Sequence, residues 1–426
     1  MLSAQFIREN LERVRRDITS RGAQAPLDTI LVLDEQRRAL IGEVEGRRAE
    51  RNTASKAIGQ TKDPDERAKR IEAARALGEE LEGLEAQLRE AEEALNQSLY
   101  EVPNVLDPET PVGIDDSENV TVLTVGQARE FSFEPRPHWE VGESLDGIDL
   151  ERGAKMSGSR FFVLRGGIAR LHRAMLQWMI DFHVDGGYIE HYLPYMLTEE
   201  SFFASGHLPD FRDNLYQDAE QDYLFIPTAE APFANLYRDE ILPPGSLPLR
   251  LVAHTPCFRR EKMSAGRDTR GLKRLHQFEK VEMFVFCEPE ESEAELQTMV
   301  ERASGLAEAL EIPYRVLQLC SGDIGFKASK AYDIELWSPG VGEWLEVSSI
   351  SDTLDFQARR ANVRFRPAAE TRPRFPHMLN GSGLGAPRAL VAIIENYQQE
   401  DGSIAIPRVL QPYMGGTTRI EAESST

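Results

Sequence analysis

Apolar residues recur at alternating steps of three and four over residues 27–58, which is the spacing of a heptad seam. The seam positions are Ile30, Leu33, Arg37, Leu40, Val44, Arg47, Arg51, Ala54 and Ile58. The pattern stops between Gly59 and Pro64 and resumes with Ile71, Leu77, Leu81, Leu84, Leu88, Ala91 and Leu95. Such a seam is typical of a coiled coil, and a proline cannot continue the first helix. The pattern therefore predicts two helices of about 30 residues each, folded back on one another as an antiparallel coiled coil.

The pattern changes near residue 115, where short runs rich in β-branched and aromatic residues are separated by hairpin-scale loops. These runs predict strands over 160–166, 186–197, 221–227, 249–260, 277–287, 332–337 and 342–351. Helical spacing predicts helices over 167–185, 290–310 and 386–399. Because the loops are short, an antiparallel sheet is favoured over a parallel one with helical crossovers. The expected fold class is α+β, with a helical coiled-coil arm followed by an antiparallel β-sheet flanked by helices.

The changes in residue pattern along the chain divide it into four predicted parts. Residues 1–101 form an N-terminal domain that carries the arm, and a proline-containing linker spans 102–114. A larger domain covers 115–415, and the polar segment 416–426 is expected to be a disordered tail.

Composition narrows the class of protein. The chain has 426 residues and is 41% hydrophobic and 28% charged, which is typical of a globular protein without a membrane span. Cys257, Cys287 and Cys320 are scattered; they fit a reducing cytoplasm and lack the spacing of a structural zinc site. A net charge of −22 argues against indiscriminate nucleic-acid binding but leaves room for one RNA contacted by local basic patches.

The stretch from His254 to Phe286 places charge inside two predicted strands. Arg259 lies at the end of the first strand and is followed closely by Glu261, and Lys280 and Glu282 lie in the second strand. The loop between the strands is basic and contains glycine, with Arg267, Arg270, Lys273 and Arg274 among its residues. Buried charge is costly unless a partner compensates it. The pattern predicts a ligand that carries phosphates, a carboxylate and an amine.

This hairpin, FRREKMSAGRDTRGLKRLHQFEKVE, resembles motif 2 of class II aminoacyl-tRNA synthetases and is similar in detail to that of the seryl-tRNA synthetases. Arg260, Lys262 and Met263 depart from the small residues common there, and one hypothesis is that their added charge strengthens tRNA binding. Other segments match the family in order. They are the helix and strand around 185–194 (motif 1), the PTAEAP segment 227–232, EVSS at 346–349, and NGSGLGAPR at 380–388 (motif 3).

The resemblance implies a class II catalytic domain over 115–415 that activates L-serine with ATP and Mg²⁺ and transfers it to tRNA(Ser), and also to tRNA(Sec). It implies that Arg259, Arg274 and Arg388 are the catalytic cations. Implied serine ligands are Thr228, Glu230, Arg259, Glu282, Asn380 and Ser382. Implied ATP ligands are Arg259, Glu261, Arg274, Leu275, Phe278, Glu346, Val347, Ser348, Ser349 and Arg388. Glu261 would accept from the adenine amino group and Phe278 would stack on the base.

The EVSS segment is expected to hold magnesium on the ATP phosphates. Glu346 and Ser349 are the implied ligands, because a carboxylate and a hydroxyl suit a hard cation that keeps its waters. Strand alternation predicts Glu346 and Ser348 on one face, with Ser349 beyond. His276 is the one histidine expected near the site, in a structural role, and no residue can be named as the base for transfer to tRNA.

The arm resembles the N-terminal tRNA-binding arm of the same family, although spacing alone fits an oligomerisation or spacer device equally well. Its implied tRNA contacts are Arg47, Arg51, Lys56, Lys62, Arg67, Lys69 and Arg70. A cytoplasmic homodimer is implied by motif 1 and by the family. The alternatives are an amino acid:carrier-protein ligase, which the arm disfavours, and an inactive paralogue that serves as a binding protein, which the intact motifs disfavour. A threonyl- or prolyl-tRNA synthetase is disfavoured because the arm and the serine-pocket residues occur together.

Overall fold

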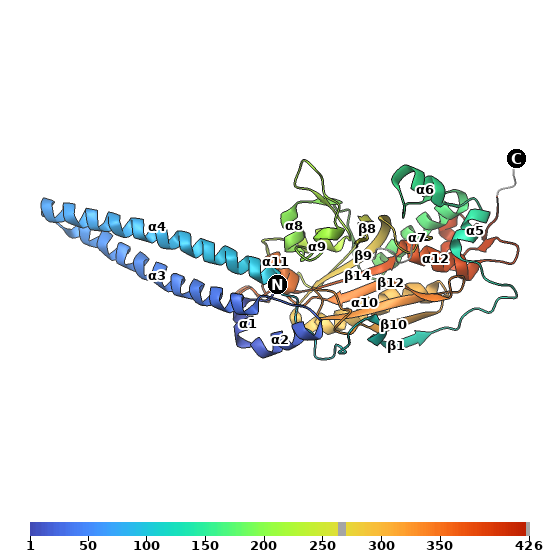
Figure 1. Ribbon diagram of the computed structural model, residues 1–426, viewed down its shortest axis with the longest axis horizontal. Helices are drawn as coiled ribbons and strands as arrows, with labels where there is room; N and C mark the ends of the chain where they lie inside the picture. Colours follow the sequence, from blue (N-terminus) through green and yellow to red (C-terminus); the bar gives the residue numbers. More distant parts are fainter. Residues whose placement is uncertain (263–269, 423–426) are drawn as a thin grey trace. The chain divides into compact units, whose positions relative to one another are not determined.

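The computed structural model describes residues 1–262 and 270–422 (Figure 1). The chain forms two compact units, one of residues 1–19 and 23–103 and one of residues 20–22 and the chain from Asn104 onward. Asn104 Nδ2 donates to the carbonyls of Lys327 and Thr353, each at 2.9 Å. Most of the segment expected as a linker is therefore part of the second unit. Met263, Arg267 and the end of the expected tail lie outside the described residues.

The first unit is helical, as predicted. Its helices are α1 (Ala4–Glu9), α2 (Leu11–Ser20), α3 (Leu27–Gln60) and α4 (Pro64–Tyr100). The helical hairpin turns at residues 61–63, where the Asp63 side chain accepts from the N–H groups of Asp65 and Glu66 and Pro64 occupies the first turn. The long helices α3 and α4 run side by side (Figure 1), so the predicted antiparallel arm is confirmed.

The seam of the arm differs from the prediction at one position. Ile71 is 51% exposed. The step of six residues from Ile71 to Leu77 turns an α-helix by about 600°, which places Ile71 roughly 120° from the seam. The two seam arginines Arg37 and Arg47 cross to the other helix, pairing with Glu92 and Glu80 at 3.2 and 3.1 Å. Their alkyl stems can cover the seam while their charged ends stay near water.

An eight-stranded sheet organises the second unit. Its order is β1-β10-β11-β12-β14-β9-β8-β4, with every pair antiparallel except β4 and β8. The strands are β1 (Val120–Val125), β4 (Ile189–Glu190), β8 (Leu249–Phe258), β9 (Gln277–Cys287), β10 (Tyr314–Gln318), β11 (Lys330–Ser338), β12 (Glu343–Asp352) and β14 (His377–Gly385). The predicted antiparallel sheet is confirmed.

Helices and two-residue strand pairs surround this sheet. The helices are α5 (His138–Ser144), α6 (Leu150–Ser157), α7 (Gly166–Asp185), α8 (Glu199–Ala204), α9 (Glu230–Asn235), α10 (Ser292–Ala309), α11 (Phe356–Arg360) and α12 (Ala386–Tyr397). The short strands pair as β2 (Ile148–Asp149) with β3 (Val163–Leu164), β5 (Met196–Leu197) with β6 (Leu224–Phe225), β7 (Ile241–Leu242) with β13 (Arg364–Phe365), and β15 (Ile404–Ala405) with β16 (Arg419–Ile420). The three predicted helices correspond to α7, α10 and α12.

Several sequence expectations need correction. The strands predicted over 160–166, 186–197 and 221–227 shrink to the short strands β3, β4, β5 and β6, because apolar runs form long strands only where a partner strand is available. The glycine-rich motif 3 segment 380–388 forms the end of the central strand β14 and enters α12 at Ala386. Arg419 and Ile420, expected in a disordered tail, form β16, and Ile420 is buried in the main core.

The main core lies between the sheet and the helices α7, α10 and α12. On β9 the side chains of Val281, Met283 and Val285 enter this core. Because side chains alternate along a strand, Lys280 and Glu282 point to the opposite face of the sheet. That face carries the polar residues described next. No helix of residues 1–262 or 270–422 is long and apolar enough to cross a membrane.

Candidate active site

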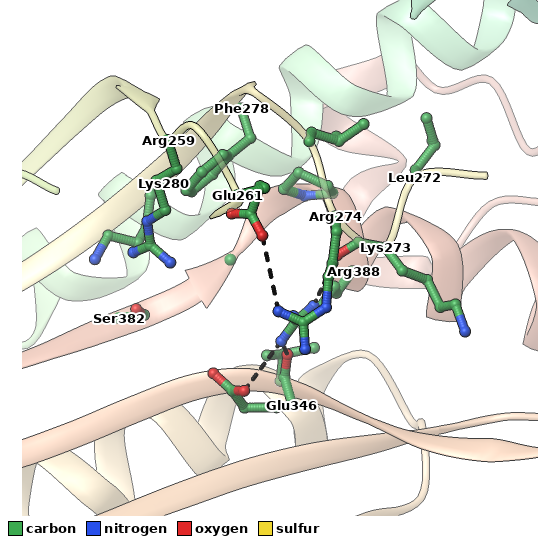
Figure 2. A pocket seen from close by; sticks show the side chains of 14 residues that line it. Arg259, Glu261, Leu272, Lys273, Arg274, Phe278, Lys280, Glu346, Ser382 and Arg388 are labelled. Carbon is green, nitrogen blue, oxygen red and sulfur yellow. Dashed lines mark hydrogen bonds and ion pairs between the residues drawn. The ribbon is translucent and has the colours of Figure 1, made fainter. Parts of the chain in front are cut away.

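Two adjoining pockets open on the polar face of the central strands. The first is lined by Arg259, Glu261, Leu272, Lys273, Arg274, Leu275, Phe278, Lys280, Glu346, Val347, Ser382, Gly385, Pro387 and Arg388 (Figure 2). The second encloses about 420 Å³ and includes Thr228, Glu230, Lys280, Glu282, Lys327, Ser349, Asn380 and Ser382. Arg259, Lys280, Glu346 and Ser382 line both pockets. A ligand could therefore extend from one pocket into the other.

Arg259 stands at the junction of the pockets, just beyond the end of β8. Its Nε donates to the Pro227 carbonyl at 3.2 Å, and its guanidinium carbon lies 5.1 Å from the centre of the Phe278 ring. These contacts fix the planar group while leaving its other N–H donors available for a carboxylate or phosphate. The aromatic face of Phe278 on β9 is positioned for stacking in the first pocket (Figure 2).

Glu261 adopts a left-handed backbone conformation with φ of 52°. This conformation is unfavourable for a residue with a side chain, and such residues gather at functional sites. Its carboxylate lies between two guanidinium groups, 3.7 Å from that of Arg160 and 3.8 Å from that of Arg274. Arg160 was not anticipated from the sequence, because it lies in the turn after α6, about 100 residues before the hairpin. The two guanidinium groups hold the Glu261 carboxylate, a hydrogen-bond acceptor, at the edge of the first pocket.

Arg388, in the first turn of α12, links three parts of the first pocket (Figure 2). Its Nε donates to the Lys273 carbonyl at 3.1 Å, and Nη1 donates to the Glu346 carbonyl at 2.8 Å. The same Nη1 lies 3.1 Å from a carboxylate oxygen of Glu346. The guanidinium therefore connects β12, α12 and residues 270–276, the return segment of the hairpin that leads into β9. Its charge faces the space beside Arg274.

The second pocket contains a buried lysine between two acceptors. Lys280 Nζ donates to Thr228 Oγ1 at 2.8 Å and forms an ion pair with Glu282. Burial raises the pKa of Glu282, and Lys280 offsets this only in part. Ser382 on β14 is the direct cross-strand partner of Glu282, so a carboxylate and a hydroxyl adjoin on one wall of the pocket. Asn380 lines the same pocket two residues earlier on β14.

Glu230, the first residue of α9, is buried and heavily coordinated. Lys327 Nζ and Gln357 Nε2 both donate to its Oε1 at 2.6 Å, and His207 Nε2 lies 3.6 Å from Oε2. Burial raises the pKa of Glu230, but the nearby Lys327 and His207 outweigh it and bring the pKa to about 2. Burial, assisted by Lys327, lowers the pKa of His207 to about 3, so this imidazole is neutral at pH 7. Glu230 is thus an ionised acceptor that can bind a cationic group.

Lys327, Gln357 and His207 were not anticipated as site residues. They come from a loop before β11, from α11 and from the segment after α8, and they carry no motif in the sequence. Only the folding of these distant segments around Glu230 brings them together. The expectation that His276 alone would lie near the site is wrong, because His207 lies beside Glu230 and His138 contacts the backbone of Leu272.

A β-bulge changes which residues of the EVSS segment face the pockets. Along β11 and β12, Ile334 pairs with Ser348 and Glu335 pairs with Glu346, so Val347 is the extra residue. The bulge places Glu346 and Ser349 on the pocket side, whereas Ser348 donates to the Ser382 carbonyl outside both pockets. The expectation that Glu346 and Ser348 share a face is therefore wrong. Among the described residues no group of three or more His, Cys, Asp or Glu side chains could hold a metal ion.

The remaining expected residues lie on the arm and in the early hairpin loop. In the arm, Arg47 pairs with Glu50 and Glu80, and Arg70 pairs with Glu66. The other expected contacts, Arg51, Lys56, Lys62, Arg67 and Lys69, are exposed. In the hairpin, Arg260 lies over the ring of Tyr216 and Lys262 is 3.8 Å from Asp213.

Comparison with known proteins agrees with this geometry. Residues 1–106 match the family described as "Seryl-tRNA synthetase N-terminal domain", and residues 211–397 match "tRNA synthetase class II core domain (G, H, P, S and T)". A serine–tRNA ligase from Thermomicrobium roseum is 56% identical over 421 residues, covering 99% of this chain and 95% of its own length. One from Chloroflexus aurantiacus is 53% identical over 421 residues, covering 99% and 100%.

Solved structures give the same result. A seryl-tRNA synthetase from Pyrococcus horikoshii, determined as a complex with ATP, superposes with a TM-score of 0.91. It is 37% identical in sequence, and the match covers 100% of both chains. A cytoplasmic serine–tRNA ligase from Naegleria fowleri, in complex with AMP, has a TM-score of 0.87 and 30% identity, covering 100% of this chain and 99% of its own.

Proposed function

The chain belongs to the seryl-tRNA synthetase family, and we propose that its two pockets activate L-serine with ATP and then transfer the seryl group to the terminal adenosine of tRNA(Ser). One observation carries this assignment of residues. A pocket lined by Arg259, Arg274 and Arg388, with a carboxylate acceptor and an aromatic face, adjoins a second pocket with Thr228, Glu230, Glu282 and Ser382, and Arg259 lines both. The first suits a nucleotide and the second suits a small zwitterion that carries a hydroxyl.

The activation step needs orientation and charge neutralisation. The carboxylate of serine is already an anion, so no general base is required for its oxygen to attack the α-phosphorus. As that bond forms, the bond from the α-phosphorus to the pyrophosphate oxygen breaks, and pyrophosphate leaves with its electron pair. Arg259 would bind the attacking carboxylate and the α-phosphate, while Arg274 and Arg388 would neutralise the outer phosphates. Glu261 would accept from the adenine amino group, beside the backbone of Leu275.

The second pocket would supply specificity for serine. The ionised Glu230 and the Thr228 hydroxyl would bind the α-ammonium, and Glu282 with Ser382 would bind the side-chain hydroxyl. Asn380 would line the same wall. Alanine would leave Glu282 and Ser382 without a partner, and a site built around hydrogen bonds discriminates on the order of 10⁴-fold against a substrate that lacks them.

Magnesium would bind with the ATP phosphates beside Glu346 and Ser349. The donor set fits, because the bulge brings a carboxylate and a hydroxyl to the same wall and hard cations prefer oxygen ligands. When bound, the ion would offset phosphate charge. The protein's own contribution is to fix Glu346 through its contacts with Arg388.

Transfer to tRNA would follow by attack of the terminal adenosine hydroxyl on the seryl carbonyl, which releases AMP. We propose that the exposed basic residues of α3 and α4 bind the RNA backbone. They would supply a local positive surface on a chain whose net charge is −22. The protein is proposed to act in the cytoplasm, where its three free buried cysteines fit a reducing environment.

A homodimer is also proposed. The segment after α7 exposes three large apolar side chains, with Ile189, Tyr192 and Met196 exposed by 56%, 87% and 51%. Exposed apolar surface is a feature of protein–protein interfaces when it is contiguous, and these three residues lie close together in the sequence. Sedimentation velocity should give twice the monomer mass for the wild-type chain, and Tyr192→Glu should shift the distribution toward monomer. A monomeric wild-type chain at micromolar concentration would contradict the dimer.

The experiment that tests the proposed chemistry is ATP–pyrophosphate exchange with each standard amino acid in the absence of tRNA. Exchange with serine alone is expected. Exchange with another amino acid would overturn the assignment of the second pocket, and no exchange would favour an inactive paralogue. Aminoacylation of tRNA(Ser) then tests the transfer step, and the same assay with tRNA(Sec) tests the wider range that the resemblance implies.

A further inference from the structure

A buried histidine outside both pockets contacts the backbone of the hairpin's return segment. His138, the first residue of α5, is fully buried. Its Nδ1 lies 2.8 Å from Oε1 of Glu395 on α12, and its backbone N–H donates to the same oxygen at 2.9 Å. On the other side of the ring, Nε2 accepts the backbone N–H of Leu272 at 3.0 Å. The ring therefore bridges a carboxylate and the hairpin.

These partners fix the tautomer and the orientation of the imidazole. The Leu272 N–H can only donate, so Nε2 must be the unprotonated nitrogen and Nδ1 must carry the hydrogen that Glu395 accepts. Glu395 is itself held, since its Oε2 accepts from Ser338 Oγ at 2.6 Å and from the Gly340 N–H at 2.8 Å. Burial raises the pKa of Glu395, but hydrogen bonds from His138 and Ser338 outweigh it and lower the pKa.

Residues of α12 hold two neighbouring backbone groups of the hairpin, one through His138 and one directly. The N–H of Leu272 is held through His138 and Glu395, and the carbonyl of Lys273 accepts directly from Arg388 at 3.1 Å. The next residues, Arg274 and Leu275, line the first pocket. Two fixed points this close together determine the path of the backbone and hence the direction of both side chains.

The residue before Leu272 is shaped to the histidine. Gly271 has φ of 80°, and a Cβ at this position would lie 2.2 Å from His138 Nε2. A side chain would therefore collide with the ring and occupy an unfavourable backbone conformation. Arg270 adds a further contact, with its guanidinium carbon 5.0 Å from the centre of the Trp139 ring. The start of α5 is thus the surface on which the return segment rests.

We propose that His138 is a positioning residue for ATP. Its imidazole holds the backbone of Leu272, so that Arg274 and Leu275 present their binding groups to the nucleotide. The inference rests on the proposed assignment of the first pocket to ATP. His138 itself touches no substrate. Glu395 fixes the tautomer of the imidazole, so residues of α12 hold both the Leu272 N–H, through His138, and the Lys273 carbonyl, through Arg388.

The test compares two substitutions of His138 that distinguish its hydrogen bond with Glu395 from its hydrogen bond with Leu272. In His138→Asn the amide nitrogen replaces Nδ1, so the bond to Glu395 is kept and the bond to Leu272 is lost. In His138→Gln the longer side chain brings an amide oxygen within reach of the Leu272 N–H. In serine-dependent pyrophosphate exchange, H138N should raise the KM for ATP about fivefold to twentyfold and leave the KM for serine within about twofold. H138Q should restore most of the ATP affinity.

A matched control is Tyr397→Phe, which removes another buried hydrogen bond of α12, from the hydroxyl to the Leu310 carbonyl at 2.7 Å. It should lower Tm without changing either KM. If H138N lowers Tm while the KM for ATP stays at the wild-type value, or if it raises both KM values equally, the positioning role is overturned. Should H138N fail to fold, Gly271→Ala displaces the same backbone from the hairpin side and should give the same ATP-specific rise.

Titration calorimetry with ATP alone separates this inference from the proposed function. A wild-type protein that binds ATP but shows no pyrophosphate exchange with any amino acid would contradict the proposed reaction. In that case a weaker ATP Kd in H138N would still support the positioning role, and an unchanged Kd would overturn it. A wild-type protein that does not bind ATP would overturn the assignment of the first pocket and the positioning role with it.

Discussion

The ammonium group of Lys327 lies 2.6 Å from Oε1 of Glu230, the carboxylate proposed to bind the ammonium group of serine. Gln357 donates to the same oxygen, so Oε1 is occupied and Oε2 is the oxygen available to the substrate. The carboxylate is therefore ionised and immobile before serine arrives. Such preorganisation reduces the entropic cost of binding, but it makes the protonation state of Glu230 depend on Lys327.

Replacing Lys327 by Met should make serine binding sensitive to pH. With Lys327 present the pKa of Glu230 is about 2, so the carboxylate stays ionised throughout the neutral range. Without this cation, burial raises the pKa, and the group becomes protonated as the pH falls. The KM for serine in pyrophosphate exchange should rise about tenfold at pH 8, and further at pH 6, while wild type changes little.

Lys330→Met is the matched control, because Lys330 is a buried lysine three residues away that pairs with Glu109 and Glu293 outside the pockets. It should leave the KM for serine and its pH profile unchanged. A pH-independent KM in K327M would show that Lys327 does not keep Glu230 ionised.

Glu282→Ala should impair serine recognition much more than ATP recognition. Glu282 is buried beside Ser382 and is the proposed acceptor for the serine hydroxyl. Loss of this acceptor should raise the KM for serine on the order of 100-fold and reduce the preference for serine over alanine. Exchange kinetics with serine, alanine and ATP provide the measurement.

The control for E282A is Glu279→Ala on the same strand, whose carboxylate contacts His254 at 2.6 Å away from the pockets. E279A should keep the serine preference. Equal increases of the two KM values in E282A would be incompatible with a role in reading the hydroxyl.

Acidification should destabilise the protein through His183 on α7. Burial, assisted by Arg302, lowers the pKa of this histidine to about 3. Between the unfolded pKa near 6.5 and about 3, the unfolded chain binds a proton that the folded chain does not. The free energy of unfolding should therefore fall as the pH drops below about 6.5, by up to roughly 1.4 kcal/mol per pH unit.

His183→Leu should remove this contribution, so its free energy of unfolding should decrease less between pH 7 and pH 5 than that of wild type. Urea denaturation at several pH values measures the difference. Met179→Leu, at a buried apolar position on the same helix, should retain the wild-type slope. Identical slopes for H183L and wild type would refute the assignment of this acid sensitivity to His183.

The double change Lys62→Glu, Lys69→Glu should weaken tRNA binding without affecting amino acid activation. Both lysines are exposed near the turn between α3 and α4. Loss of two phosphate contacts should reduce the slope of log affinity against log salt by about 2. Filter binding across a salt series and pyrophosphate exchange provide the two readouts.

Arg89→Glu is the control for the arm, because Arg89 is exposed on α4 but far along the helix from that cluster. It should leave the salt slope unchanged. If the double change alters neither the slope nor the KM for tRNA, the arm contacts RNA elsewhere or serves as a spacer.

The sequence alone specifies those features that depend on local order. A heptad seam and a proline after Asp63 are sufficient to define the helical hairpin, because helix periodicity and helix breaking are local properties. The alternation along β9 likewise predicts that Lys280 and Glu282 share a face. The motif residues Arg259, Glu261 and Arg388 could be named in advance because their order along the chain resembles a family.

Tertiary structure decides everything that depends on which segments meet. Because of the bulge at Val347, Ser349 and not Ser348 lines the second pocket. A bulge depends on pairing with the partner strand and so cannot be read from the residues within it. Lys327 and Gln357 reach Glu230 from distant segments, and their contacts exist only after long-range folding. His138 lies more than a hundred residues before Leu272, and only the packing of α5 against α12 makes its imidazole a support for the nucleotide pocket.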